Sequence, residues 1–182
     1  MNYYSGKDLA RSFRLVRQNT LQIANEIPEE HYGFRATADT RSVAETLAHI
    51  AGSPSWQHKL HGRDRKMSMR GDEFGPYIQE AAAYSATLKT KAEIVKALEA
   101  DGAQFAAWLE SLDDETLGEV VAFPAGATPP GKTRFEMLLS SKEHEMHHRA
   151  QLMVLQRMIG IVPHLTRARL QQQQRPAEPA VR

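Results

Sequence analysis

The last long helical pattern of the chain, residues 133–160, reads TRFEMLLSSKEHEMHHRAQLMVLQRMIG, and it decides the fold. It opens with Thr133 and Glu136 at the spacing of a capping box, and it ends at Gly160, a residue type that often terminates helices. At about 100° per residue, His144 and His148 fall on the apolar stripe of this run. That stripe consists of Met137, Ser141, His144, His148, Leu155 and Ile159. The stretch therefore predicts a long helix with two histidines on its core-facing side.

A third histidine, His49, closes a shorter run of the same kind, SVAETLAHI at residues 42–50. Imidazoles at positions i and i+4 project from one side of a helix, and a third from a neighbouring helix would complete a three-histidine site. Zinc and nickel accept that donor set and keep open positions for water or substrate. A histidine on an apolar face is more often a hydrogen-bonded core residue, and that alternative stays open. Burial of three unpartnered rings would cost free energy, which favours His49, His144 and His148 as metal ligands.

Similar start signals mark the other helices. Ser42 with Glu45, and Thr90 with Glu93, repeat the capping-box spacing ahead of apolar residues at helical intervals. Ser5 precedes a further apolar run that ends at a proline. Four such runs predict an all-α protein, a four-helix bundle with long crossover loops.

The connections and the C-terminus are less regular. Gly52-Ser53-Pro54 should kink the second helix or end it just after His49. The connections 62–89 and 113–132 are long, and we expect a short helix in the first and a short strand in the second. We assign residues 1–165 to the bundle and residues 166–182 to a tail that is disordered or dependent on a partner, because apolar periodicity stops.

The composition bounds the class of protein. The chain has 182 residues, 41% hydrophobic and 25% charged, with a formal net charge of +1, which is ordinary for one globular domain. No basic stripe suggests a nucleic-acid partner, and no stretch nears the roughly 20 apolar residues that span a bilayer. There is no cysteine, which excludes disulfides, thiolate ligands and a cysteine nucleophile. Because no signal-peptide pattern opens the chain, we expect a cytoplasmic protein.

Polar and aromatic residues near the three histidines could form a pocket. Ser53 and Ser141 are small and would leave space in a core that is normally filled. With Trp56 and Gln151, they are candidates for the pocket wall or for support of the ligands.

The run His144-Glu145-Met146-His147-His148 also matches the pattern H-E-x-x-H. In zinc proteases with that pattern the two histidines bind zinc and the glutamate is the general base. Glu145 is therefore a candidate base, although it could equally be a solvated helix residue beside the stripe. His147 points toward the flank and is not expected to bind the ion.

Two segments resemble a known family. GFRATADTRSVAETLAHI at residues 33–50 and EHEMHHRAQL at residues 143–152 resemble the DinB-like damage-inducible proteins. Relatives of that family include mycothiol-dependent maleylpyruvate isomerases and bacillithiol S-transferase-type proteins. Ala36 and Ala150 depart from the family pattern, at positions that are not ligands. The resemblance covers residues 5–162.

The resemblance implies an up-down-down-up order of the four helices, a divalent metal on His49, His144 and His148, and often a homodimer. Family members of known activity use low-molecular-weight thiols. We therefore expect a metal-dependent transferase that acts with such a thiol on a small-molecule substrate. Two alternatives stay open: a metal-hydroxide hydrolase with Glu145 as base, and a non-catalytic stress-response module that binds a ligand.

Overall fold

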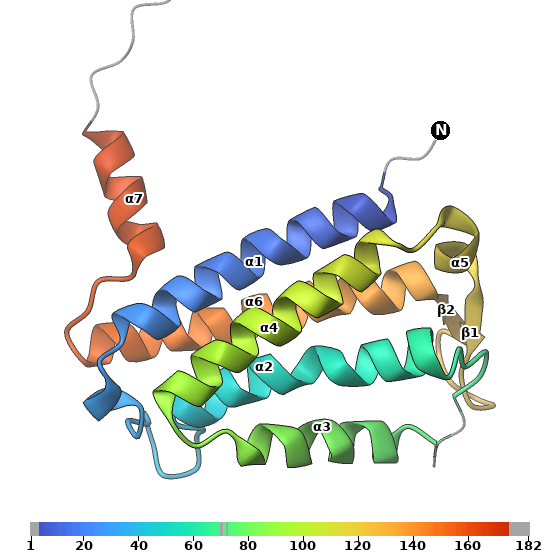
Figure 1. The fold of residues 1–182 in the computed structure, drawn as a ribbon, viewed down its shortest axis with the longest axis horizontal. Coiled ribbons are helices and arrows are strands. Elements are labelled where there is room, and N and C mark those ends of the chain that lie inside the picture. The colour runs from blue at the N-terminus through green and yellow to red at the C-terminus, as the bar shows by residue number, and fades with distance from the viewer. Residues whose placement is uncertain (1–3, 70, 72, 175–182) are drawn as a thin grey trace, which may run out of the picture.

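Four long helices pack side by side in the structure, a computed structural model that describes residues 4–69, 71 and 73–174 (Figure 1). They are α1 (Gly6–Glu26), α2 (Val43–His58), α4 (Lys91–Glu110) and α6 (Arg134–Met158). Each begins at a complete capping box, in which the first side chain accepts from a backbone N–H and an acidic side chain accepts in return. The boxes are Ser5 with Asp8, Ser42 with Glu45, Thr90 with Glu93 and Thr133 with Glu136. The three boxes predicted from the sequence are confirmed.

Contacts between the helices give their directions. α1 and α6 run in one direction, whereas α2 and α4 run in the other. The contacts that show this are Tyr4 with Phe135 between α1 and α6, Asn25 with Lys91 between α1 and α4, and Gln57 with Met137 between α2 and α6. The helix order is therefore up, down, down, up, and the predicted bundle is confirmed.

The helix α3 (Gly75–Thr87) is the crossover that allows α2 and α4 to run in the same direction. It lies along α2 (Figure 1) and packs closely against Gly52. A Cβ atom at Gly52 would lie 2.3 Å from Oγ of Ser85 and 3.0 Å from the carbonyl oxygen of Ala81, so only glycine allows this approach. The predicted short helix between residues 62 and 89 is present.

The remaining elements are short. A 3-10 turn, η1 (Glu29–His31), follows α1. The second long connection holds α5 (Asp114–Gly118) and the antiparallel strands β1 (Val120–Ala122) and β2 (Gly131–Thr133). The predicted strand is therefore present, paired as a small hairpin against the end of the bundle.

The core fills the space between the four long helices. The fully buried apolar side chains include Leu9, Phe13, Ile23, Leu47, Ile50, Ile94, Leu98, Leu109, Leu138 and Leu152. Burial of each such side chain stabilises the fold by about 1.5–3 kcal/mol. No helix in the described part of the chain is both long enough and apolar enough to cross a membrane.

Pro54 does not end α2, contrary to one of the two outcomes expected at this position. The helix continues to His58 and then into a π-helical turn, η2 (Lys59–Arg63). Pro54 has no backbone N–H to donate to the carbonyl oxygen of Ile50 one turn earlier. That oxygen instead accepts from Nη2 of Arg17 at 3.3 Å. A side chain of α1 therefore satisfies the group that the proline leaves free.

The C-terminal segment differs from the expected disordered tail. Residues His164–Gln173 form a further helix, α7, which projects away from the bundle (Figure 1). Only its first turn is attached: His164 bonds to Asn19 at 2.9 Å, and Arg167 pairs with Glu26 at 2.6 Å. Residues 166–173, which were assigned to the tail, therefore belong to a helix that is attached at its start. Residues 175–182 lie outside the described part of the chain. The dependence of this segment on a partner stays a prediction.

Candidate metal centre

Three histidine rings meet between α2 and α6. Nε2 of His144 lies 3.0 Å from Nε2 of His49 and 3.1 Å from Nε2 of His148. One ring nitrogen of each residue lies within 4.8 Å of the other two. Two imidazoles that bound zinc at about 2.0–2.1 Å in a tetrahedral site would hold their nitrogens about 3.3 Å apart. The two spacings around His144 are slightly shorter than that, and a small movement of the rings would open them, so the three residues could hold a metal ion.

The other ring nitrogens of two of these histidines contact neighbouring side chains. Nδ1 of His148 lies 2.7 Å from Oε1 of Gln151, and Nδ1 of His144 lies 3.2 Å from Oγ of Ser53. An amide oxygen only accepts, so Nδ1 of His148 carries the proton and its Nε2 presents a lone pair. Partners of this kind fix the orientation and tautomer of ligating histidines. Gln151 and Ser53 therefore contact two of the three rings, and their supporting role stays a prediction.

The nitrogen atoms of the three histidines are better placed to bind a shared cation than to contact one another directly. When Ser53 accepts the Nδ1 proton of His144, as Gln151 does for His148, two Nε2 lone pairs face each other at 3.1 Å. Lone pairs at that distance repel, whereas a divalent ion would form a bond with each. Three imidazole nitrogens are a donor set for zinc or nickel, the ions expected from the sequence.

Burial keeps the three rings neutral. It lowers the pKa of His49 and of His144 to about 4, and the positive charge of Arg41 acts in the same direction. Burial also lowers the pKa of His148, against the opposite effect of the hydrogen bond that its Nδ1–H donates to Gln151. Neutral imidazole is the form that binds metal ions, so the ligands are ready at neutral pH.

A cavity of about 410 Å³ opens beside His49 and His144. Residues of α2, α3 and α6 form its walls, and Arg41 lies at its edge. The lining residues are Arg41, His49, Ser53, Trp56, Gln57, Ile78, Ala81, Ala82, Ser85, Ser140, Ser141 and His144. Ser53, Trp56 and Ser141, predicted as pocket residues, are among them. Gln151 lies in an adjoining hollow that also contains Arg41.

Glu145 lies in the bundle core, not in solvent and not in the cavity. Its carboxylate accepts from Nε of Arg17 at 3.0 Å and from Nη2 at 2.9 Å. The side chains of Arg17 and Glu145 are 5% and 3% exposed. The interpretation of Glu145 as a solvated residue is therefore wrong, because Arg17 supplies a buried partner that the sequence did not reveal. As a general base it would have to leave this ion pair, which is costly in a core.

Two arginines that matter for the site were missed in the sequence. Arg17 stands on the apolar face of α1 among Phe13, Val16 and Thr20, and a charge at such a position signals a buried partner. Arg41 directly precedes the cap residue Ser42, and nothing in its neighbours along the chain indicates that it reaches the histidines.

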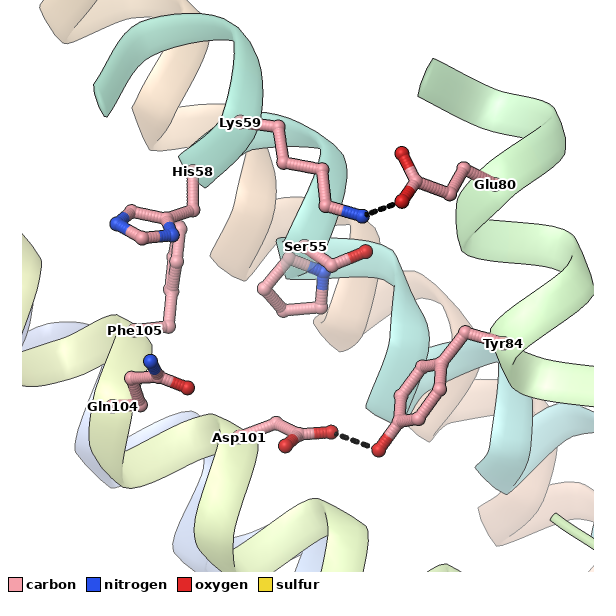
Figure 2. A pocket seen from close by; sticks show the side chains of 9 residues that line it. Ser55, His58, Lys59, Glu80, Tyr84, Asp101, Gln104 and Phe105 are labelled. Atoms are coloured by element: carbon pink, nitrogen blue, oxygen red, sulfur yellow. Dashed lines mark hydrogen bonds and ion pairs between the residues drawn. The ribbon is translucent and has the colours of Figure 1, made fainter. Parts of the chain in front are cut away.

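A second hollow, of about 450 Å³, lies between α2, α3 and α4 (Figure 2). Its charged groups are already paired: Lys59 with Glu80 at 2.5 Å, and Asp101 with the hydroxyl of Tyr84 at 2.6 Å. Burial lowers the pKa of His58, so this ring is neutral. Among the described residues, the charged side chains that line this hollow are therefore already engaged, and the group that could hold a metal ion is the three histidines.

Comparison with known proteins agrees with the geometry. The sequence profile of the DinB superfamily matches residues 12–152. The chain belongs to the DinB superfamily. No curated protein sequence matches the chain.

Two solved structures share the DinB fold of this chain. YfiT from Bacillus subtilis, described as a probable metal-dependent hydrolase with an unusual four-helix bundle topology, is similar with a TM-score of 0.64 and 14% identity. The match covers 88% of this chain and 91% of YfiT. The sibling lethal factor precursor DfsB is similar with a TM-score of 0.62 and 15% identity, over 88% of this chain and 100% of DfsB. At these identities the likeness concerns the fold alone.

Proposed function

We propose that this DinB-superfamily protein is a metal-dependent transferase that joins a low-molecular-weight thiol to a small electrophilic substrate. The observation that carries the proposal is the meeting of the Nε2 atoms of His49, His144 and His148 beside a cavity. Three protein ligands leave coordination positions open, which is the arrangement of catalytic metal sites.

The residues of the chain would divide the work as follows. The three histidines would hold zinc or nickel, and Gln151 and Ser53 would keep two of the rings in the ligating tautomer. A divalent ion bound there lowers the pKa of a thiol and so supplies a thiolate at neutral pH. Trp56 and the apolar side chains of α3 would bind the body of the electrophile and exclude water from it.

Hydrolysis is the second candidate, supported by the description of YfiT as a probable metal-dependent hydrolase. It needs a general base near the ion, and Glu145, the base candidate of the sequence, is held by Arg17. None of the described residues that line the cavity is an Asp or a Glu. Transfer of a thiolate needs no such base, which is why we favour it.

The proposal is tested with protein purified without an affinity tag and loaded with zinc or nickel. It should accelerate conjugation of cysteine or glutathione to chlorodinitrobenzene, and His148→Ala should lose the acceleration. His147→Ala is the matched control, because His147 is an exposed histidine one position away in the same helix. A rate equal in His148→Ala and wild type would overturn the proposal.

Two other outcomes would assign a different class. Ester hydrolysis without added thiol, lost in His148→Ala, would favour the hydrolase. Tight binding of a small molecule without turnover of any thiol would favour a non-catalytic ligand-binding module. The homodimer and the cytoplasmic location implied at the level of sequence stay predictions, and the first is checked by sedimentation.

A further inference from the structure

One cationic side chain lines the cavity beside the histidine cluster and has no partner of its own among the described residues. Arg41 precedes α2 and lines both the cavity beside His49 and His144 and the adjoining hollow. Arg41 is exposed, and within the described residues no hydrogen bond or ion pair to it is found. The guanidinium is therefore available to a ligand.

The cavity offers no negative charge to balance Arg41. Its described lining contains no acidic residue, and Glu145 beside His144 in α6 is neutralised by Arg17. Asp39 lines only the adjoining hollow, where it accepts from the hydroxyl of Thr37. An unpaired guanidinium in a partly enclosed site produces a positive potential, and such a site selects anions.

The rest of the lining suits a small molecule with an apolar body. Trp56, Ile78 and two alanines of α3 form an apolar wall, and four serines add hydroxyl groups. Oγ of Ser141 is buried and has no hydrogen-bond partner among the described residues. An acceptor atom of a ligand could accept a hydrogen bond from this hydroxyl. The hydroxyl would then no longer be buried without a partner, which costs free energy.

We infer that the substrate of this site is a small organic carboxylate. Its carboxylate would pair with the fork of Arg41, its apolar body would lie against Trp56 and α3, and its reactive group would face the three histidines. The placement of the reactive group rests on the proposed function. Binding of the carboxylate by Arg41 requires no metal, so the two can be tested separately.

The test compares benzoate with its neutral isostere benzamide by calorimetry on chelator-treated protein. Benzoate should bind wild-type protein about tenfold more tightly than benzamide, and Arg41→Gln should reduce this preference to less than about twofold. Arg41→Lys, which keeps the charge but loses the fork, should give an intermediate preference. Arg11→Gln is the matched control, since Arg11 is an exposed arginine of α1 that pairs with Asp8.

A second arm repeats the comparison on metal-loaded protein. It uses succinate monohydroxamate and the analogue in which the carboxylate is replaced by an amide, and the hydroxamate of both compounds would coordinate the ion. The carboxylate should again improve binding in wild type and Arg11→Gln but not in Arg41→Gln. Equal binding of benzoate and benzamide by wild type, or a preference that survives in Arg41→Gln, overturns the inference. Failure of the protein to bind metal overturns the proposed function instead, because the metal-free arm still decides the role of Arg41.

Discussion

Arg17 of α1 donates to both carboxylate oxygens of Glu145, the residue that follows His144 in α6. The same guanidinium donates to the carbonyl oxygen of Ile50, which follows His49 in α2, and to the carbonyl oxygen of Leu98 in α4. Gly102 makes room for it, because a Cβ there would lie 2.9 Å from Nη1. One side chain thus links all four long helices at the level of the histidines and holds α2 and α6 in the register that brings the three histidine rings together.

Removal of one partner of the buried Arg17–Glu145 ion pair should lower the free energy of unfolding. Arg17→Met leaves the Glu145 carboxylate buried without a counter-charge, and we expect a loss of about 3–5 kcal/mol in the free energy of unfolding. The double variant Arg17→Met with Glu145→Met should recover much of that loss, since it removes both charges. Urea denaturation measures both. A single variant that loses less than about 1 kcal/mol would contradict the assigned role of the pair.

Pro54 and Arg17 should be coupled in their effects on stability. Pro54→Ala restores a backbone N–H that can donate to the carbonyl oxygen of Ile50, so this oxygen no longer depends on Arg17 alone. The stability lost on Arg17→Met should then be smaller by about 1 kcal/mol in the Pro54→Ala background. A double-mutant cycle measures the coupling, and additive effects would show that the proline and the arginine act independently.

The pH dependence should follow the depressed histidine pKa values. In the unfolded chain His49 and His144 take up protons below about 6.5, whereas burial delays uptake in the folded chain to about 4. The unfolded state binds more protons between those values, so stability should fall as the pH drops from 6.5 toward 4. The free energy of unfolding of His49→Gln, measured by urea denaturation, should decrease less steeply over this pH range. An equally steep decrease in this variant would show that other groups cause the pH dependence.

Metal affinity of the folded chain should follow a different curve. Burial lowers the pKa of His49 and of His144 to about 4 and also lowers that of His148, so affinity should change little between neutral and mildly acidic pH and should fall as the pH nears 4. Competition titrations with a chelator at several pH values measure this. A midpoint near 6.5, the ordinary histidine value, would show that the rings are hydrated in solution.

Two truncations should separate the anchored and free parts of α7. Deletion from residue 171 onward removes only exposed residues of the described helix, and stability should change by less than about 0.5 kcal/mol. Deletion from residue 164 also removes the bond to Asn19 and the ion pair with Glu26, and the melting temperature should fall measurably. A large loss on the shorter deletion would mean that the end of the chain docks on the bundle or on a second subunit.

Much of the fold, and the meeting of the three histidines, could be predicted from local patterns. A capping box requires only residues three positions apart, and the i, i+4 spacing of His144 and His148 fixes their common side in any helix. The position of His49 opposite them required only that both stripes face the core. These features are encoded within one or two helical turns, which is why the sequence reveals them.

The features that escaped prediction depend on contacts between distant segments. Glu145 is buried because it pairs with Arg17, which is 128 positions away in the chain. Pro54 is tolerated because α1 supplies a donor that no local pattern predicts. Arg41 lines the cavity beside the histidines because of the path of the loop before α2, and α7 is attached to α1 through His164 and Arg167.

The central claim is that His49, His144 and His148 hold one divalent ion, and elemental analysis of tag-free protein tests it most directly. After incubation with zinc and removal of excess metal, wild type and His147→Ala should each retain close to one ion per chain. His49→Ala, His144→Ala and His148→Ala should each retain little or none, because two imidazoles at this site hold the ion weakly. Metal retained at the wild-type ratio by the variant that lacks all three histidines would contradict the account.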